Sequence, residues 1–146
     1  MEHEIIKIKE FITAGKALFT LKNEETGNRF TFKVSKPKDS NKDMFFVSLL
    51  NGPDNYSNYQ YMGSIFGQKF TLTKKSKIGQ AAPSYRAFNW LWDMIIGNHD
   101  LPEQVKVLHN GKCARCGRRL TVPESIESGF GPHCLEKAFG KHPALS

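Results

Sequence analysis

The cysteines near the C-terminal end constrain the fold of this chain more than any other feature. Two residues separate Cys113 from Cys116, Gly117 follows directly, and Cys134 comes after 17 intervening residues. A two-residue spacing lets a tight turn direct both sulfurs at one metal ion, and a glycine after the second cysteine suits the left-handed backbone that such a turn often needs. The pattern therefore predicts a structural zinc site with three thiolate ligands.

A fourth ligand is needed, because structural zinc normally binds four groups. We favour His109, which lies four residues before Cys113 at the end of an expected strand. His133 adjoins the third cysteine and His142 lies beyond a short expected helix, and both stay as alternatives. Water in the fourth position is a further alternative.

Free thiols and a redox pair are two other interpretations of the cysteines. Three free thiols would be unusual in such a spacing, and disulfides are disfavoured in a reducing cytosol. A thioredoxin-like redox pair would need a helix after the second cysteine, whereas Arg118 and Arg119 lead into a probable strand over residues 119–122. Zinc is the better prediction.

The overall composition restricts the class of protein. The chain has 146 residues, a formal net charge of +7 and 39% hydrophobic residues. That apolar content can build a core, which excludes a wholly disordered chain. No apolar run reaches the roughly 18 residues of a membrane helix, and the N-terminus lacks the apolar stretch of a signal peptide. We expect a protein of the cytoplasm with no membrane association.

Residues 1–80 have the pattern of an antiparallel sheet or small open barrel. Phe30, Phe32 and Val34 alternate with polar residues, which is the period of a strand, and turn residues around Gly27 indicate a hairpin. A second hairpin is expected around Gly67. The expected strands are residues 4–12, 17–22, 29–35, 44–50, 59–66 and 69–74.

The pattern changes to that of a helix after residue 80. Ser84 is a candidate N-cap, Gly97 with Asn98 ends the segment, and apolar residues recur every three or four positions between them. We expect Phe88, Trp90 or Trp92 to pack this helix onto the sheet or onto the zinc module. A short strand over residues 103–109 leads to the cysteines.

The predicted fold class is therefore α+β. An N-terminal antiparallel β domain (1–80) is followed by an amphipathic helix and linker (81–102) and by a zinc-binding module (103–146) that resembles a treble-clef knuckle with a short closing helix.

Two acid-free basic clusters indicate a nucleic-acid partner. The first consists of Lys69, Lys74, Lys75 and Lys77, and the second contains Lys112, Arg115, Arg118 and Arg119. Cations on a turn held by metal lose little entropy on phosphate contact, and neutralised phosphates release counterions. The first cluster lies near tyrosines in the sequence, which suggests stacking residues as in small barrels. A solvated charged surface is the simpler explanation of the first cluster.

The segment from Cys113 to Cys134 resembles a short zinc-finger domain of unknown function found in phage, mobile-element and actinobacterial proteins. The resemblance covers about 30 residues, and the matching residues are Cys113, Cys116, Gly117, Arg118, Leu120, Thr121, Ser125, Gly129, Gly131, Pro132 and Cys134. It implies a zinc site and a phage or mobile-element origin. A His-x-Gly-x-Cys lead-in is usual in that family, which supports His109 as the fourth ligand.

Three functions follow from these features. Binding of DNA or RNA is the main prediction, with zinc purely structural. The alternative is an inhibitor or adaptor that binds a host protein, for which the tyrosine-rich residues 56–61 have a suitable composition. An enzyme is the least favoured, because a metal-dependent nuclease using His99 and Asp100 would need an open metal position, and the motif of a zinc deaminase is absent.

Overall fold

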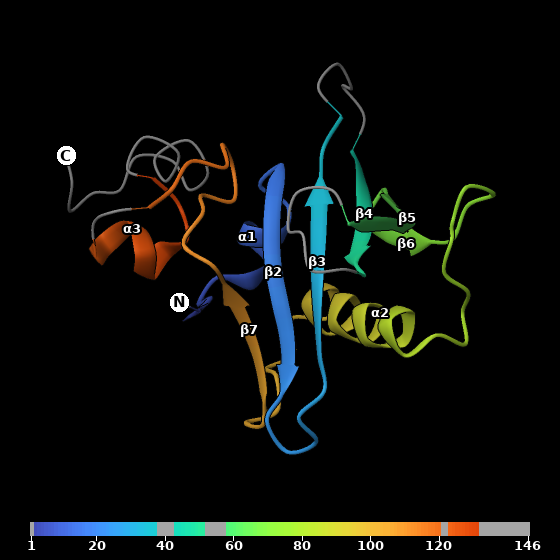
Figure 1. Ribbon diagram of the computed structural model, residues 1–146, viewed down its shortest axis with the longest axis horizontal. Coiled ribbons are helices and arrows are strands. Elements are labelled where there is room, and N and C mark those ends of the chain that lie inside the picture. Colours follow the sequence, from blue (N-terminus) through green and yellow to red (C-terminus); the bar gives the residue numbers. More distant parts are fainter. Residues whose placement is uncertain (1, 38–42, 52–57, 121–122, 132–146) are drawn as a thin grey trace.

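The computed structural model describes residues 2–37, 43–51, 58–120 and 123–131 (Figure 1). In chain order its elements are β1 (His3–Glu4), α1 (Ile8–Ile12), β2 (Lys16–Asn23), β3 (Arg29–Ser35), β4 (Met44–Leu50), β5 (Tyr59–Phe66), β6 (Lys69–Thr71), α2 (Pro83–Ile96), β7 (Val105–His109) and α3 (Pro123–Ser128).

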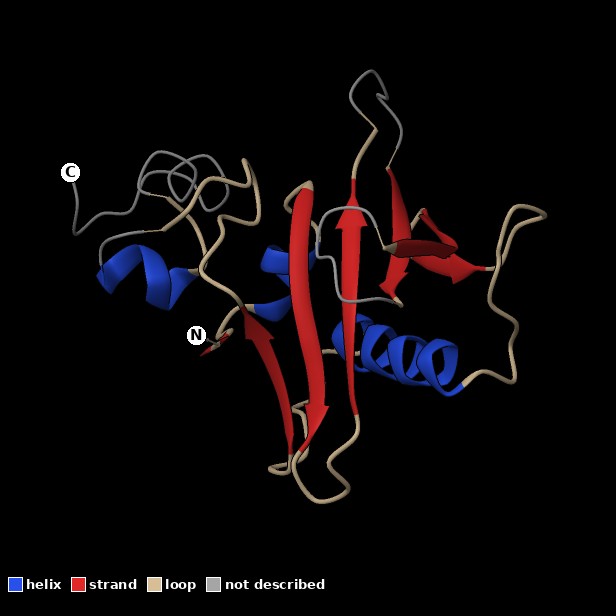
Figure 2. Cartoon of the chain, viewed as in Figure 1, coloured by secondary structure: helices blue, strands red, loops and turns tan. Residues whose placement is uncertain are grey.

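The described strands form one antiparallel sheet in the order β1-β7-β2-β3-β4-β5-β6 (Figure 2). The hairpin of β2 and β3 pairs Phe19 with Phe32, and the expected second hairpin joins β5 to β6. The prediction of an α+β protein dominated by an antiparallel sheet is confirmed. Most strand bounds lie within one or two residues of those expected from the alternation of apolar and polar residues.

The strand expected over residues 4–12 is wrong. Only His3–Glu4 pairs as a strand, and Ile8–Ile12 forms the helix α1, in which Phe11 and Ile12 are buried. Apolar residues in this segment recur at three- and four-residue spacing, which is the helical period. The high content of isoleucine, a residue that favours strands, concealed that spacing.

Helix α2 begins two residues earlier than expected and without the predicted cap. Ala82 is the N-cap residue and makes no side-chain cap bond, while Pro83 starts the helix and Ser84 is buried in its first turn. Proline suits the first helical position because its missing N–H would have no partner there. Gly97 ends the helix, as predicted.

The core forms where α2 packs on one face of the sheet. The Phe88 ring lies 5.2 Å from that of Phe32 and 4.8 Å from that of Phe70, measured between centroids. The Trp92 indole N–H donates to the Gln68 carbonyl oxygen at 2.9 Å, whereas Trp90 is 37% exposed. The helix therefore packs on the sheet. None of the described helices is long and apolar enough to cross a membrane.

Strand β7 brings the C-terminal part of the chain into the sheet. It pairs with β1 on one side and with β2 on the other, so that His109 lies opposite Phe19. The Lys16 N–H also donates to the Ala114 carbonyl oxygen at 2.7 Å. The division into residues 1–80, 81–102 and 103–146 stays a prediction, and hydrogen bonds join the first range to the third.

Candidate functional site

The first two cysteines lie in a tight turn formed by residues 112–119, here called the cysteine turn. The Cys113 N–H donates to the Arg118 carbonyl oxygen at 2.8 Å, and the Gly117 N–H donates back to the Cys113 carbonyl oxygen at 2.8 Å. Gly117 has a φ of 79°, which explains the glycine at this position. Lys112 and Arg119 form a β-bridge that closes the turn.

The Cys113 side chain is fully buried and surrounded by backbone donors. Burial raises the pKa of this thiol, but bonds from the N–H groups of Gly131, Cys116 and Arg115 outweigh burial and leave the pKa below its ordinary value. Donors of this kind stabilise negative charge on sulfur. These donors shift Cys113 towards the thiolate, the form that binds metal.

The chain also returns towards this sulfur just before the third cysteine. The Gly131 N–H bonds to Cys113, and Cys134 follows three residues later. Three residues span at most about 10 Å, so Cys134 is within chain reach of the cysteine turn. Cys134, His133 and His142 lie outside the described residues. Within the described residues, no three His, Cys, Asp or Glu side chains gather closely enough to hold a metal ion.

His109 is buried at the end of β7, and both of its ring nitrogens face backbone groups. Nε2 lies 2.6 Å from the Ile126 carbonyl oxygen, and the Gly111 N–H donates to Nδ1 at 3.1 Å. Burial lowers the pKa of His109, the bond to Ile126 opposes that effect, and the charge of His3 adds to it. In this conformation the ring is neutral, with the proton on Nε2, and it is held by β7 and α3 rather than directed at the two cysteines.

Phe11 is the residue of this region that sequence reasoning missed. Its ring lies 6.1 Å from that of Phe130 and 5.7 Å from that of His109, between centroids. Gly129 has a φ of 80°, and a Cβ there would lie 2.6 Å from the Phe11 ring. The helical spacing of residues 4–12 indicates a helix with Phe11 on its buried face, but it does not indicate the contacts of Phe11 with Phe130 and His109.

The basic residues of the cysteine turn lie on its surface. Arg115, Arg118 and Arg119 are exposed and Lys112 is half-buried. Lys16, which we did not predict, joins them, because its side chain passes 3.7 Å from the position that a Cβ on Gly117 would take. The cluster is thus one cation larger than the sequence indicated.

The lysines of the first basic cluster are far from the cysteine turn. Lys69 begins β6 at one edge of the sheet, and Lys74, Lys75 and Lys77 are exposed in the segment that follows. The cysteine turn follows β7, near the other edge (Figure 1). The two clusters predicted from sequence are therefore not one patch.

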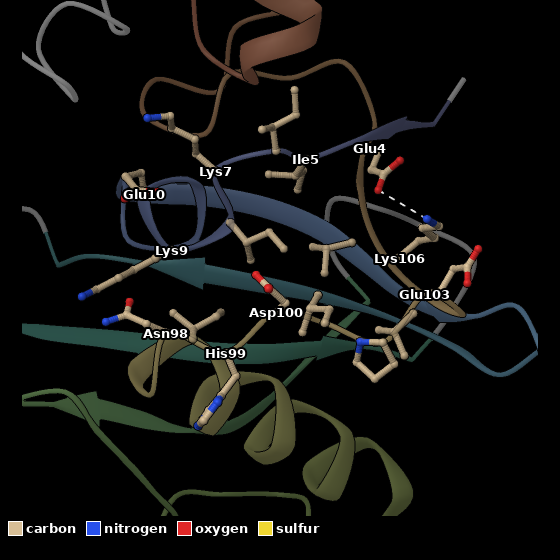
Figure 3. A pocket seen from close by; sticks show the side chains of 17 residues that line it. Glu4, Ile5, Lys7, Lys9, Glu10, Asn98, His99, Asp100, Glu103 and Lys106 are labelled. Atoms are coloured by element: carbon tan, nitrogen blue, oxygen red, sulfur yellow. Dashed lines mark ion pairs between the residues drawn. The ribbon is translucent and has the colours of Figure 1, made fainter.

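A pocket of about 620 Å³ contains His99 and Asp100, the pair considered for a nuclease (Figure 3). The His99 ring packs over Gly97 at the end of α2, where a Cβ would lie 2.6 Å from it. Elsewhere in the pocket, the Lys106 Nζ lies 3.6 Å from Glu4 Oε1. The arrangement gives His99 a packing role at the end of the helix.

Comparison with known proteins concerns the same C-terminal region. A family described as "Family of unknown function (DUF6011)" matches residues 106–139. The match includes the cysteine turn and agrees with a short C-terminal domain of unknown function. No curated protein and no solved structure matched the chain significantly.

Proposed function

We propose that this chain is a small nucleic-acid-binding protein, encoded by a phage or mobile element, in which a structural zinc ion holds the cysteine turn. The observation that carries the proposal is the cysteine turn itself. A buried thiol, surrounded by backbone donors, lies beneath a surface of exposed arginines. The first feature supports a metal site and the second supports a phosphate partner.

The donor set fits zinc. Thiolates are soft ligands that zinc prefers, and Cys113 has the donors that stabilise a thiolate. Cys116 is half-buried in the same turn and Cys134 is within chain reach. These three cysteines would hold the ion, which would fix the backbone of the turn and supply no chemistry.

The fourth ligand is better sought after residue 131 than at His109. Binding through Nδ1 of His109 would displace the Gly111 N–H, and binding through Nε2 would displace the Ile126 carbonyl oxygen. Neither loss is needed if His133 or His142 completes the site. We therefore revise the sequence-based preference and propose that His109 supports the fold between β7 and α3.

A rigid turn with exposed cations suits phosphate binding. The cations are Lys16, Lys112, Arg115, Arg118 and Arg119. A metal-held backbone orders their anchoring atoms before contact, so that less entropy is lost on binding. Each phosphate neutralised on a single strand adds about 0.7 to the slope of log affinity against log salt concentration.

The test compares two double variants that remove the same charge. Arg118→Ala with Arg119→Ala removes two cations from the turn, whereas Lys9→Ala with Arg86→Ala removes two exposed cations from α1 and α2. We expect the first variant to reduce the slope of log affinity against log salt concentration by about 1–1.5. Its affinity for a labelled oligonucleotide should fall as well. The control should bind as the wild type does. Equal affinities for all three proteins would refute a role for the turn.

A second function, binding to a host protein, is favoured by one groove. A cavity of about 480 Å³ lies between α2 and the end of the β2–β3 hairpin, and it is lined by Trp90, Arg86 and Phe30 among others. Tryptophan and arginine dominate many protein interfaces. If this function is the correct one, Trp90→Ala abolishes nuclease-resistant capture of a stoichiometric partner, and nucleic-acid affinity is absent. Of the tyrosine-rich stretch, Tyr59 and Tyr61 are half-buried in β5, and Tyr56 lies outside the described residues.

A further inference from the structure

The face of the sheet opposite α2, here called the open face, contains residues that the cysteine turn does not use. Directly paired residues of neighbouring strands point to the same face of a sheet. One row of pairs crosses four strands from Lys16 through Ser35 and Phe46 to Ser64. Because Lys16 also borders Gly117, this row starts at the cysteine turn and leads across the sheet.

Aromatic rings are exposed at the far end of this row. Phe46 is 38% exposed and Phe66 is 56% exposed, although both lie in the strands of a sheet whose other face is buried. The pair Met44–Phe66 next to the pair Phe46–Ser64 places both rings on the open face. The Tyr61 ring meets Phe46 edge to face, with centroids 6.1 Å apart. Exposure of grouped apolar rings to water is unfavourable, and such groups commonly mark a binding site.

The open face presents exposed lysines, whose positive charge favours binding of a polyanion. Lys16, Lys33 and Lys69 are exposed on it, and Lys33 Nζ lies 5.5 Å from the centroid of the Tyr59 ring.

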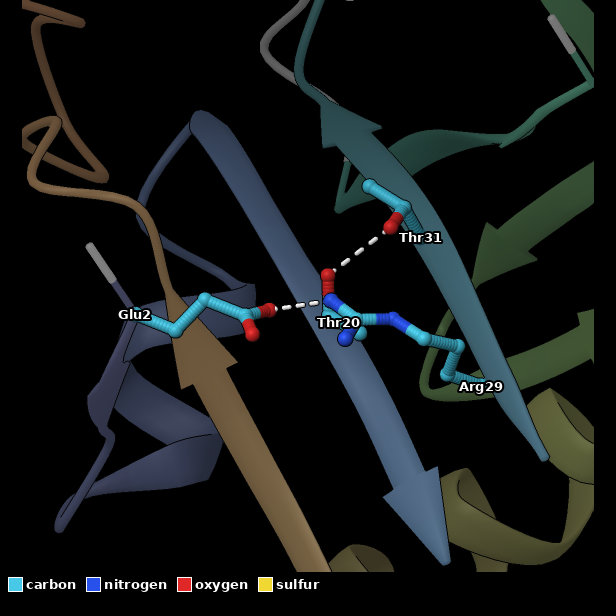
Figure 4. Close-up of polar contacts among 4 residues, drawn as sticks. All are labelled: Glu2, Thr20, Arg29 and Thr31. Atoms are coloured by element: carbon cyan, nitrogen blue, oxygen red, sulfur yellow. Dashed lines mark hydrogen bonds and ion pairs between the residues drawn. The ribbon is translucent and has the colours of Figure 1, made fainter. Parts of the chain in front are cut away.

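Two described carboxylates, Glu4 of β1 and Glu2 in its N-terminal flank, are paired with cations of the protein. Glu2 bonds to Arg29 near the Thr20–Thr31 pair (Figure 4), and Glu4 pairs with Lys106. The Thr20 and Thr31 hydroxyls bond to each other at 2.8 Å, so this part of the face is polar but uncharged. Among the residues named here, Lys16, Lys33 and Lys69 are the cations of the described face without a carboxylate partner.

We infer that the open face binds single-stranded nucleic acid, with bases stacked on Phe46, Tyr61 and Phe66 and with the backbone following Lys16 and Lys33 to the cysteine turn. This inference rests on the proposed function and specifies its substrate class. Ring faces can stack only on bases that are not already stacked in a duplex. Strands lie about 4.8 Å apart, so the row from Lys16 on β2 to Phe46 on β4 spans about 10 Å, which a few nucleotides cover.

The experiment measures affinity for a labelled oligonucleotide, single-stranded or in a duplex of the same length, by fluorescence anisotropy. It uses the full-length, zinc-loaded chain, with DNA and RNA as separate arms. We expect wild type to prefer the single strand. Phe46→Ala with Phe66→Ala should weaken single-strand binding at least about fivefold, since stacking contributes on the order of 1–3 kcal/mol per base. Duplex binding and the salt slope should be unchanged, and Trp90→Ala on α2 is the matched aromatic control.

The outcomes separate the two claims. If wild type binds and the Phe46/Phe66 variant binds a single strand equally well, the open-face inference is wrong and the proposed function stands. If wild type binds no nucleic acid at low salt, both fail. A second readout avoids any effect on folding: an iodouracil-substituted single strand should photocrosslink to Phe46, Tyr61 or Phe66. Crosslinks only at Trp90 or in the cysteine turn would also contradict the inference.

Discussion

At the scale of single residues, Gly129 shows how one position combines two constraints. Its φ of 80° strains any other residue, and the Phe11 ring occupies the space of a Cβ. Gly111 has the same φ with no atom within 4 Å of that space. A substitution at Gly111 therefore tests backbone strain alone, whereas one at Gly129 tests strain together with steric overlap.

Alanine at these two positions should give different losses of stability. Gly111→Ala should cost about 1–2 kcal/mol, the penalty of a left-handed backbone. Gly129→Ala should cost at least about 1 kcal/mol more, because Phe11 is buried and must move. Urea denaturation measures both, and equal losses would show that the Phe11 contact is unimportant.

His109 gives a second prediction at this scale. His109→Gln removes a buried ring with two backbone bonds, and we expect a loss of about 1–3 kcal/mol in the free energy of unfolding. The variant should keep one zinc ion per chain, measured by native mass spectrometry. Cys113→Ser should lose the ion. Loss of zinc from folded His109→Gln would restore His109 as the fourth ligand.

At the scale of elements, helix α2 stabilises the sheet through Phe88. This ring is fully buried and contacts rings from β2, β3 and β6. Phe88→Ala should cost about 3–5 kcal/mol in the free energy of unfolding, measured in urea. Trp90 lies two residues after Phe88, on another side of the helix, and is partly exposed. Trp90→Ala should therefore cost less than about 2 kcal/mol in the free energy of unfolding. A similar loss for both variants would mean that α2 does not anchor on the Phe88 side.

Elements whose apolar residues follow one clear period could be predicted from sequence. The hairpin of β2 and β3 and the apolar face of α2 belong to this group, because alternation and helical spacing are read directly from the residues. The order of strands could not be predicted. β7 lies between β1 and β2, and nothing in the residues Val105–His109 themselves indicates a pairing with strands near the N-terminus of the chain.

Some features of the candidate site could be predicted from sequence in the same way, and others could not. The spacing of Cys113, Cys116 and Gly117 predicted a tight turn with a left-handed glycine, and that backbone is present. The contribution of Lys16 and Phe11 could not be predicted, because both reach the turn through tertiary packing. His109 was chosen by its position in the chain, whereas its hydrogen bonds depend on where α3 packs.

At the scale of the whole molecule, the cysteine turn shares the core of the sheet, and under the proposed function it needs zinc to keep its own shape. Cys113, Ala114 and Phe130 are buried with Phe11, yet the region is too small to build a separate core. Zinc removal should therefore unfold the turn and leave most of the sheet intact.

Hydrogen exchange tests this dependence on metal. After chelation the amides of Cys113, Gly117 and Leu120 should exchange rapidly, while those of β2 to β5 and α2 stay protected. Protection that is the same with and without chelator would mean that packing alone holds the turn.

We propose that the zinc-loaded protein binds nucleic acid through fixed cations, and the salt dependence of binding tests this proposal most directly. Anisotropy titrations of a labelled single-stranded oligonucleotide should be made at several salt concentrations. Contacts from the five cations near the cysteine turn predict a slope of log affinity against log salt of about −2 to −3.5. Binding that is absent at low salt, or independent of salt, would contradict the account.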